Sequence, residues 1–473
     1  MVNVAVIGTG FVGLTHATVT ARFGHDVIAY DINAEKIAAF SSGNKDLIDE
    51  IIYEKNLADL VINEFLTKRL KFTMDINDLI TCEVLFMCLP TPYKESGESD
   101  LSYLFSAAEK IVDMLINKKD TSFKLFVNKS TVPIGTAQKL KDFLHLKGLK
   151  NFDVASNPEF LPEGDAVEHA IRSSKVIVGA VNKESFEILR KVYSSFVSNP
   201  NTTYVECNPE TAEAIKYVSN TTLYGQIVLW QSIGGRVAEA FPEINFEILR
   251  KGVLADPRVA KWGSYVSAGA GGSCFKKDDL SLAFQLESKG IDSDFIKLLD
   301  NINEKQKTYI IQRAQEEAKF SFDNKKIVIL GTAFKQGTND MRESNVLAMV
   351  SKLLLLNVSE IRLYDPLALP VAKKIFDPNT DSRYKKISYH NSILESLIGT
   401  DAAIIATDHQ EFRSLTSKIL EFVSHKINKQ YLILDGRRMI SAEDLNLLLN
   451  SGISYLPVGG VFLSSNSKSN NLK

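Results

Sequence analysis

The N-terminus contains the pattern that most constrains the fold. An apolar run at residues 4–7 leads directly into a glycine-rich segment, residues 8–13, with the spacing GxGxxG. A helical pattern follows until Gly24, and a second apolar run leads to Asp31. This order of strand, glycine turn, helix, strand and acidic residue is typical of a βαβ unit that binds a dinucleotide. The sequence therefore predicts a parallel α/β sheet with a cofactor site where its first strand ends.

Each glycine of this turn has a physical role. Gly8 permits the tight turn, Gly10 lets a pyrophosphate approach the backbone at a helix N-terminus, and Gly13 lets the helix pack closely on the strand. Phe11 and Val12 complete the expected cofactor-binding turn. The alternative is a turn with a structural role only, and the complete βαβ context argues against it.

The acidic residue that follows selects between the two nicotinamide cofactors. Asp31 lies at the expected distance after the glycines for a carboxylate that binds a ribose hydroxyl. Its charge would repel a 2′-phosphate, so we expect NAD rather than NADP, and we place Lys36 in the same site.

A second motif lies at residues 271–278, where Cys274 follows two glycines and a serine. A thiol attacks a carbonyl only if its pKa is lowered or a base is close, and Lys277 and Asp278 supply a cation and a proton acceptor. The alternative is a packed structural cysteine, and the motif alone leaves both interpretations open.

Composition excludes several classes of protein. The 473 residues exceed one ordinary core, so two or three domains are expected. The balance of 55 basic and 57 acidic residues gives no sign of a nucleic-acid or membrane-surface partner. The four cysteines lack disulfide or metal spacing, no signal peptide precedes the first strand, and no apolar run could span a bilayer. We therefore expect a cytoplasmic protein without a metal.

Short β-rich runs alternate with helical patterns in two clusters, which predicts parallel sheets covered by helices. Between the clusters lies a helical stretch at about residues 209–241 and a further helical region to about residue 320. We predict two Rossmann-like, doubly wound α/β domains joined by a long central helix and a helical middle region. The predicted boundaries are 1–208 for an NAD-binding domain, 209–320 for a helical dimerisation region with the cysteine loop, 321–463 for a nucleotide-sugar domain and 464–473 for a disordered tail.

The second cluster repeats the first strand and turn in degenerate form. Residues 326–333 again place a glycine after an apolar run, but the other glycines are lost. This predicts a site for a nucleotide other than NAD.

Over nearly its whole length, the chain resembles the UDP-glucose/GDP-mannose dehydrogenase family. Besides the glycine turn and the cysteine loop, the matching motifs occur in family order at residues 89–92, 129–136, 157–161, 216–220, 256–258, 333–335, 340–344, 364–366 and 435–437. The resemblance implies oxidation of a sugar C6 alcohol to a carboxylate with two NAD per turnover.

The resemblance also implies how the reaction runs. Cys274 would form a thiohemiacetal and then a thioester, and Asp278, beside Lys277, would assist water and proton transfer. Lys216 and Asn220 lie four residues apart on one side of a helix and would stabilise negative charge on the C6 oxygen. Lys216 and Asn220 could instead be a solvated lysine and a surface asparagine.

Further site residues are implied by the same resemblance. Glu159 and Thr131 would hold water for thioester hydrolysis, and Thr131 could instead cap a helix. The expected cofactor contacts from outside the glycine turn are Pro90, Thr91, Thr131, Glu163 and Arg342. The expected contacts to the substrate are Glu159, Phe160, Leu161, Lys216, Asn220, Arg258, Tyr265, Ser267, Gly271, Phe275, Lys335 and Arg437.

Arg258 would reach the substrate of a neighbouring subunit, so the resemblance implies a homodimer formed through the middle helices. Ser273, where members that oxidise N-acetyl sugars tend to carry histidine, favours UDP-glucose as substrate and UDP-glucuronate as product. The alternatives are another UDP-hexose or GDP-mannose, or a catalytically silent sensor of nucleotide sugars.

The chain departs from the family pattern at several positions that could reshape the sugar pocket or the subunit packing. These are Pro162, Lys276, Gly225, Gln226, Gln231, Ser232 and Ala260. In addition, Gly234 and Gly235 weaken the predicted middle helix by about 1 kcal/mol each relative to alanine, so a bend is expected there.

Overall fold

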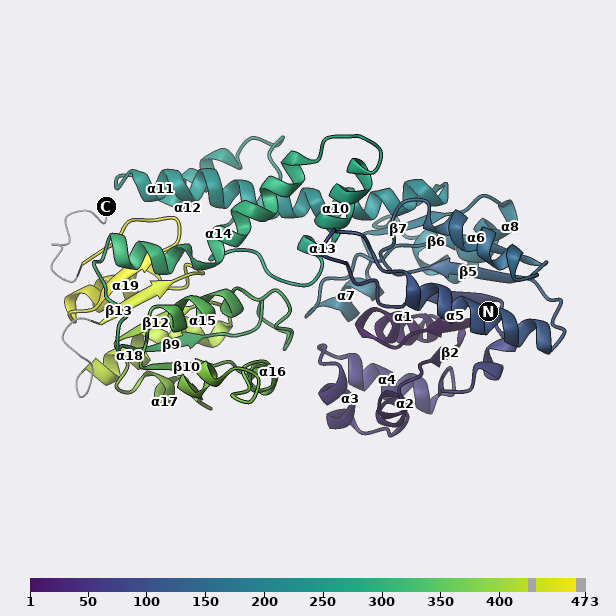
Figure 1. Ribbon diagram of the computed structural model, residues 1–473, viewed down its shortest axis with the longest axis horizontal. Coiled ribbons are helices and arrows are strands. Elements are labelled where there is room, and N and C mark those ends of the chain that lie inside the picture. The colour runs from purple at the N-terminus through teal and green to yellow at the C-terminus, as the bar shows by residue number, and fades with distance from the viewer. Residues whose placement is uncertain (424–430, 465–473) are drawn as a thin grey trace. The chain divides into compact units, whose positions relative to one another are not determined.

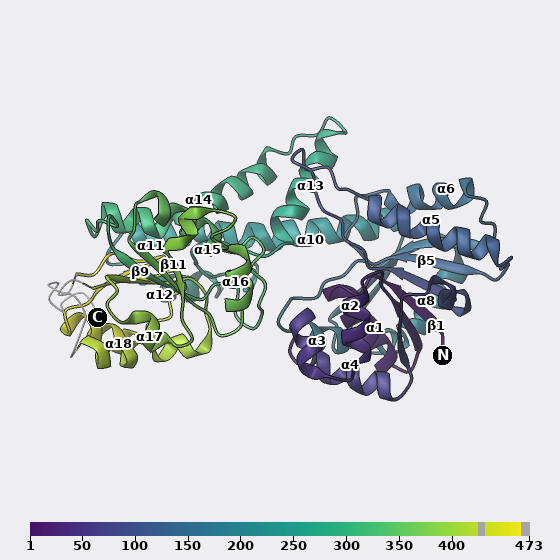
Figure 2. The same ribbon diagram turned by 60° about the horizontal axis from the view of Figure 1, so that its bottom comes forward.

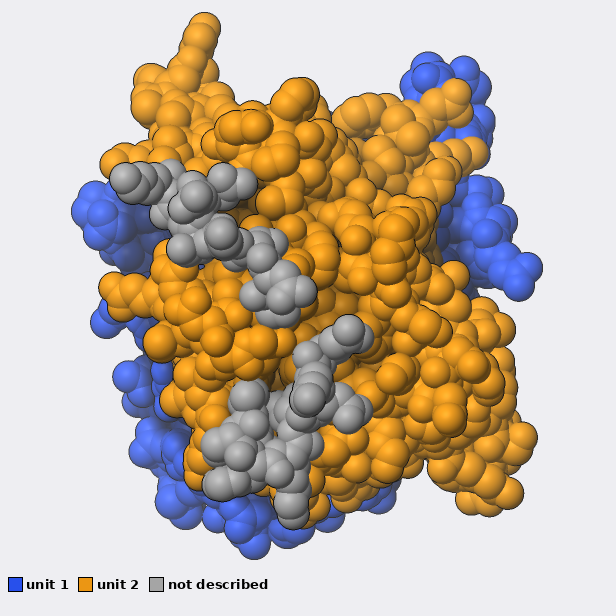
Figure 3. Space-filling view, turned by 90° about the vertical axis from the view of Figure 1, so that its left-hand side faces the viewer, with its two compact units in different colours: residues 1–220, 277–293 blue, residues 221–276, 294–473 orange. Residues whose placement is uncertain are grey.

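The computed structural model describes residues 1–423 and 431–464. The predicted disordered tail therefore lies, apart from Ser464, outside the described residues. The chain forms two compact units, Met1–Asn220 with Lys277–Ser293 and Thr221–Lys276 with Asp294–Lys473, which Figure 3 colours separately.

The first unit contains an eight-stranded sheet in the order β3-β2-β1-β4-β5-β6-β7-β8. Its strands are β1 (Asn3–Ile7), β2 (Asp26–Tyr30), β3 (Leu70–Thr73), β4 (Val84–Met87), β5 (Lys124–Asn128), β6 (Phe152–Ser156), β7 (Lys175–Gly179) and β8 (Thr203–Cys207). The first six strands have the order 3-2-1-4-5-6 that is typical of dinucleotide-binding domains. The predicted strand-and-helix alternation therefore produces the expected fold.

One pair departs from the predicted parallel arrangement, because β6 and β7 are antiparallel and pair Ser156 with Gly179. The helix between them, α7 (Ala166–Ile171), has only six residues. Because β7 runs opposite to β6 and pairs with it at the last residue of each strand, the chain enters β7 from the side of the sheet at which β6 ends. The N-terminal end of β7 therefore lies beyond the carboxyl end of β6.

Helices cover both faces of the first sheet. They are α1 (Phe11–Arg22), α2 (Ala34–Ser41), α3 (Lys45–Ile51), α4 (Leu57–Leu66), α5 (Ser102–Asn117), α6 (Thr136–Leu146), α7, α8 (Lys183–Val192) and α9 (Ser194–Val197), with a 3-10 turn at Ile76–Thr81. Helices α5 and α6 lie together on one face, and α1 lies on the other (Figures 1 and 2).

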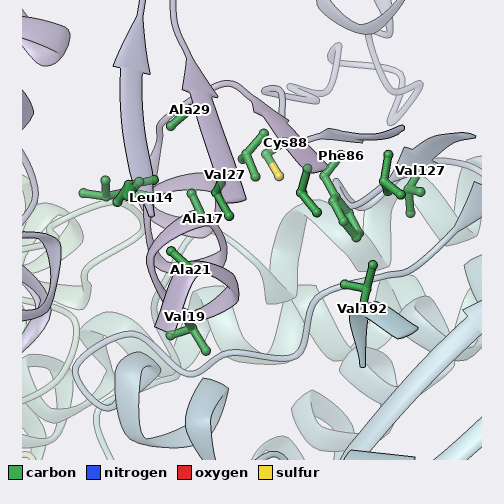
Figure 4. Close-up of a cluster of buried hydrophobic side chains, with 14 of the residues drawn as sticks. Leu14, Ala17, Val19, Ala21, Val27, Ala29, Phe86, Cys88, Val127 and Val192 are labelled. Carbon is green, nitrogen blue, oxygen red and sulfur yellow. The ribbon is translucent and has the colours of Figure 1, made fainter. Parts of the chain in front are cut away.

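The alternation along β1 explains why both faces need helices. Val4 and Val6 pack into the core beside α1. Figure 4 shows part of this core, with Leu14 and Ala17 from that helix. The intervening Ala5 and Ile7 pack into the other core, beside α5 and α6. A strand that is apolar on both sides is stable only between two helical layers.

The second unit contains a six-stranded, wholly parallel sheet in the order β11-β10-β9-β12-β13-β14. Its strands are β9 (Lys326–Leu330), β10 (Glu360–Tyr364), β11 (Ile387–Tyr389), β12 (Ala402–Ile405), β13 (Leu432–Asp435) and β14 (Ser454–Pro457). Counted from β9, this is again the order 3-2-1-4-5-6, so the prediction of two doubly wound α/β domains is confirmed.

The helices of the second unit include α11 (Arg236–Ala240), α12 (Phe246–Val253), α14 (Asp294–Glu316), α15 (Asn345–Leu355), α16 (Leu369–Ile375), α17 (Ile393–Leu397), α18 (Leu415–Val423) and α19 (Ala442–Asn450). Two 3-10 turns lie at Ser382–Lys386 and Gln410–Ser414. As in the first sheet, β9 alternates, with Ile327 and Ile329 in one core and Val328 and Leu330 in the other.

The predicted middle helix consists of α10 (Pro209–Leu229), a π-helical turn (Trp230–Gly235) and α11. The two glycines therefore mark a change of helical winding, which is a recognised way for a helix to deviate. They also allow close packing, since a Cβ on Gly234 would lie 2.9 Å from the Trp230 ring and one on Gly235 2.9 Å from Val266.

Candidate active site

The glycine turn between β1 and α1 has the geometry of a dinucleotide site. Gly8 has a φ of 92°, and a Cβ there would lie 2.5 Å from the Cys88 carbonyl oxygen. A Cβ on Gly13 would lie 1.8 Å from the Gly8 carbonyl oxygen, so only glycine lets the helix approach this closely. Gly10, by contrast, has no atom within 4 Å of its Cβ position. This leaves open space at the N-terminus of α1, where an anion is favoured.

Asp31 follows β2 and faces this turn. Its Oδ2 accepts hydrogen bonds from the Thr9 amide and hydroxyl, both at 2.8 Å, and its Oδ1 accepts one from the Asn33 amide at 3.0 Å. Burial alone would raise the pKa of Asp31, but these hydrogen bonds and Lys36, 3.4 Å away, lower it overall. The carboxylate is thus ionised near neutral pH, and its Oδ1 retains acceptor capacity for a further donor.

Residues that follow β4 and β5 meet at the same edge of the sheet. The Thr91 hydroxyl donates to the Thr131 carbonyl oxygen at 2.9 Å, so these two predicted cofactor residues are brought together. Pro90 adjoins Thr91, and Glu163 lies on the loop that follows β6, before α7. These loops come from the carboxyl ends of parallel strands, where ligands bind in such folds.

The loop after β6 lies against α10. The Lys216 Nζ is 5.1 Å from the centre of the Phe160 ring, and Lys175 Nζ is 3.9 Å from the same ring. Burial and the charge of Lys216 lower the pKa of Lys175. The predicted substrate residues Phe160 and Lys216 therefore lie close together, with Glu159 preceding the ring and the half-buried Leu161 following it.

A buried carboxylate links α10 to α13 (Phe275–Glu287). Asp278 is fully buried and accepts hydrogen bonds at 2.6 Å from the Asn220 side-chain amide on one oxygen and from Lys277 Nζ on the other. On the same pair of helices, the Tyr217 hydroxyl is 3.1 Å from that of Ser281. The structure thus joins three of the predicted catalytic residues in one hydrogen-bonded group.

The cysteine loop belongs to the second unit. Cys274 is exposed and immediately precedes α13, so its thiol lies at a helix N-terminus, where backbone amides favour an anion. Phe275 stacks on Tyr224 with ring centres 5.4 Å apart. A Cβ on Gly271 would lie 2.8 Å from the Glu343 carbonyl oxygen, so the loop packs tightly on its own unit.

Two of the predicted substrate residues lie together in the second unit. The Arg437 guanidinium is 5.9 Å from the centre of the Tyr265 ring and 2.8 Å from Asp408. Burial alone would lower the pKa of Arg437, but Asp408 raises it overall. An arginine held between an aromatic ring and a carboxylate is preorganised to bind a planar or anionic group.

The remaining predicted residues of this unit lie elsewhere on it. Lys335 is half-buried in the loop after β9. Ser267 is fully buried, and its hydroxyl accepts from Gln231 and donates to the Gly269 carbonyl oxygen, both at 3.0 Å. Arg258 and Arg342 are exposed, and each forms an ion pair of 2.6 Å with a nearby aspartate, Asp256 and Asp340 respectively.

Sequence reasoning missed several residues at these sites. Lys129 and Tyr193 surround Asn157 below the Glu159 loop, Lys175 contacts Phe160, and Asp408 holds Arg437. Lys129 begins the family motif at residues 129–136 and directly follows the strand β5. These two features of the sequence could have identified it as a site residue. Lys175 was not predictable, because its place depends on the antiparallel pairing of β6 and β7.

The site residues fit a bound NAD. The open space at Gly10, the helix N-terminus of α1 and the free acceptor capacity of Asp31 match a pyrophosphate and a ribose. When bound, NAD would accept a hydride from a substrate carbon. Across the described ranges, no helix is long and apolar enough to cross a membrane.

Three segments of the chain match the domain models of one known family. Residues 2–197 match the NAD binding domain of the UDP-glucose/GDP-mannose dehydrogenase family, residues 210–305 its central domain, and residues 328–442 its UDP binding domain. The prediction of NAD as cofactor is confirmed.

Curated relatives match over nearly the full chain. UDP-glucose 6-dehydrogenase TuaD of Bacillus subtilis is 32% identical over 97% of this chain and 93% of its own length. A UDP-glucose 6-dehydrogenase of Rickettsia felis is 33% identical over 97% of this chain and 96% of its own length.

Solved structures share the fold. A UDP-glucose dehydrogenase from Pyrobaculum islandicum superimposes with a TM-score of 0.84 at 26% identity, over 97% of this chain and 98% of that one. A UDP-D-ManNAc dehydrogenase from Pyrococcus horikoshii gives a TM-score of 0.78 at 28% identity, over 97% and 99%. On the three domain matches and the full-length relatives, this chain belongs to the UDP-glucose/GDP-mannose dehydrogenase family.

Proposed function

We propose that the protein oxidises the C6 hydroxymethyl group of UDP-glucose to the carboxylate of UDP-glucuronate, with two NAD per turnover. The observation that carries this proposal is the buried Asp278, held by Asn220 and Lys277 in the first turn of the helix that begins just after Cys274. A fully buried carboxylate is costly to keep even when two donors satisfy it, and such groups cluster at functional sites.

The proposed reaction has four balanced steps. The alcohol loses a hydride to one NAD and a proton to solvent, which gives an aldehyde. The Cys274 thiolate adds to the aldehyde carbon, and the oxygen takes up a proton, which forms a thiohemiacetal. This loses a hydride to a second NAD and a proton, which gives a thioester. Water then adds to the thioester carbon, the C–S bond breaks, and the carboxylate and the Cys274 thiolate are released, with two protons passing to solvent.

The chain's own residues have distinct roles in these steps. Lys216 and Asn220 would stabilise negative charge on the C6 oxygen, since an ammonium and an amide both donate hydrogen bonds. Asp278 would orient Asn220 and accept protons through Lys277 or water. Glu159 and Thr131 would hold the hydrolytic water. The Thr131 carbonyl oxygen also accepts a hydrogen bond from the hydroxyl of Thr91, a proposed cofactor contact.

The substrate is proposed from the relatives and from one loop residue. The two curated relatives are named for UDP-glucose, and Ser273, a small side chain, precedes the nucleophile. In the second unit, Lys335 and Arg437 would bind the diphosphate and sugar. A second candidate is an N-acetyl sugar nucleotide, because a UDP-D-ManNAc dehydrogenase shares the fold at a similar identity.

We also propose a homodimer in which Arg258 reaches the partner's substrate. Two observations support it. The Arg258 side chain is largely exposed, and four large apolar residues of the same region of the second unit are exposed as well: Leu229, Ile233, Phe241 and Ile248. Large apolar side chains exposed along one stretch of the chain, residues 229–248, support an interface there.

NADH production tests the proposal directly. Purified protein with NAD is given UDP-glucose, UDP-N-acetylmannosamine or GDP-mannose, beside a Cys274→Ser control. Two NADH per UDP-glucose, lost in the control, is the expected result. Turnover only with another sugar nucleotide would replace the substrate. Binding of NAD and UDP-glucose without NADH would instead indicate a catalytically silent sensor.

A further inference from the structure

Lys129 is a buried cation that the reaction above does not use. It lies directly after β5 and is 5% exposed. Its Nζ donates to the Asn157 side-chain oxygen at 2.9 Å and lies 3.0 Å from Glu159 Oε2. Both partners follow β6, which neighbours β5, so the contact arises from two adjacent strand ends.

Every partner of Lys129 is itself held in place. The Asn157 side-chain oxygen also accepts from the Tyr193 hydroxyl, and its NH₂ donates to the Ile177 carbonyl oxygen at 2.7 Å. The other oxygen of Glu159 accepts the Phe160 amide at 2.7 Å. Both oxygens of the Glu159 carboxylate are therefore fixed, one by an ammonium and one by the backbone.

Among the described residues, Glu159 is the one counter-charge within ion-pair distance of Lys129. The other titratable groups nearby stay neutral. Burial, and then the charge of Lys129, lower the pKa of His16, while burial raises the pKa of Cys88 to about 12 and that of Tyr193 well above its usual value. The ammonium and the carboxylate thus form an isolated ion pair in a neutral surrounding.

We propose that Lys129 is a positioning residue for thioester hydrolysis, because its ion pair holds the Glu159 carboxylate in the orientation that receives a proton from the attacking water. This rests on the proposed function. In the step concerned, Glu159 accepts a proton from water as the new C–O bond forms, the C–S bond breaks, and the Cys274 sulfur leaves as a thiolate. The proton then passes from Glu159 to solvent, and no oxidant is needed.

The Lys129→Met variant should still carry out both hydride transfers but should be slow in thioester hydrolysis. Both hydride transfers precede hydrolysis, so the first turnover should still release two NADH per enzyme as a burst. The steady rate should then fall at least tenfold, and the thioester should accumulate on Cys274, where intact-protein mass spectrometry detects the added uronyl nucleotide. Lys129→Arg, which keeps the charge, should recover part of the steady rate.

Lys124→Met is the matched control. Lys124 begins the same strand and is equally buried, but it binds the Ile80 and Cys82 carbonyl oxygens and Asp120, at the opposite end of β5. Losing this lysine disturbs the same strand without touching Glu159. It should therefore lower stability without a burst and without a trapped adduct.

The outcomes separate the two proposals. Wild-type protein that makes no NADH would overturn the proposed function itself. The role of Lys129 would be overturned if the wild type is active but the Lys129→Met variant loses the burst and the steady rate equally. It would also be overturned if this variant traps no adduct on Cys274. If Lys129→Met fails to fold, Lys129→Met with Glu159→Gln removes both charges. That double variant should hydrolyse the thioester no more than about twofold slower than Glu159→Gln alone, and a larger additional loss would contradict the inference.

Discussion

The two sheets of this chain share a strand order but differ in the turn that follows their first strand. In the first, α1 begins at Phe11, three residues after Gly8, so a helix N-terminus follows the turn at once. In the second, Gly331 keeps the turn, with a φ of 86°, but the next helix, α15, begins only at Asn345. A shared topology therefore does not imply a shared phosphate site, since the helix start supplies the amides.

The acidic residue at the second strand end sharpens this contrast. Asp31 retains free acceptor capacity on Oδ1, whereas Asp365 accepts three donors on one oxygen and two on the other. These donors are four backbone amides and His409. Asp365 thus ties the second turn together and has no acceptor left for a ribose. The same residue type at the same topological position keeps a free acceptor in one sheet and supports the loops in the other.

The largest expected effect comes from Asp365→Asn. The new NH₂ would face backbone amides that already donate to this position, so we expect a loss of about 3 kcal/mol or more in the free energy of unfolding. Both tryptophans, Trp230 and Trp262, belong to the second unit, so the urea transition followed by tryptophan fluorescence reports on that unit. A change below about 1 kcal/mol would contradict the supporting role of Asp365.

Gly13→Ala should have the next largest effect. Its Cβ would lie 1.8 Å from the Gly8 carbonyl oxygen, and overpacking of this kind costs about 1–3 kcal/mol. We expect NAD affinity, measured by calorimetry, to fall roughly 10- to 100-fold while the tryptophan transition is unchanged. The matched control is Gln336→Ala, the equivalent position after β9, which is exposed. If both variants weaken NAD binding equally, the turn after β1 would not differ from the turn after β9 as we propose.

The pH dependence of stability tests the supporting role of the Asp365 carboxylate in a second way. Burial alone would raise the pKa of Asp365, but His409 and the Ala333 and Ala368 amides lower it to about 2, from 3.8. Because the folded-state value is the lower one, this stabilisation is present above about pH 4 and is lost as the pH falls through about 2. It amounts to about 2 kcal/mol. The stability difference between wild type and Asp365→Asn should shrink by that amount from about pH 6 to about pH 2.

The sequence predicted the parts of both sheets that depend on local pattern. The apolar runs gave the strands, and the glycine spacing gave the turn, because both signals lie within a few residues. Contacts between residues at the ends of different strands were harder to predict. Lys129 meets Glu159 because β5 and β6 are neighbours, and Lys175 meets Phe160 because β7 runs antiparallel to β6. Strand order and direction are set by tertiary packing, which a single sequence does not encode locally.

The smallest expected effect decides whether Asp31 is a ligand or only a support. In Asp31→Ser, a hydroxyl can still accept the Thr9 amide, so the fold should be little changed. Loss of the charged acceptor for the ribose should weaken NAD binding about tenfold, and loss of repulsion should narrow the preference for NAD over NADP. Lys36→Met, which removes the neighbouring cation 3.4 Å away, is the control and should leave the preference for NAD over NADP unchanged or stronger. If Asp31→Ser lowers stability but leaves the cofactor preference intact, Asp31 acts as Asp365 does, and the two sheet edges differ only in where their helices begin.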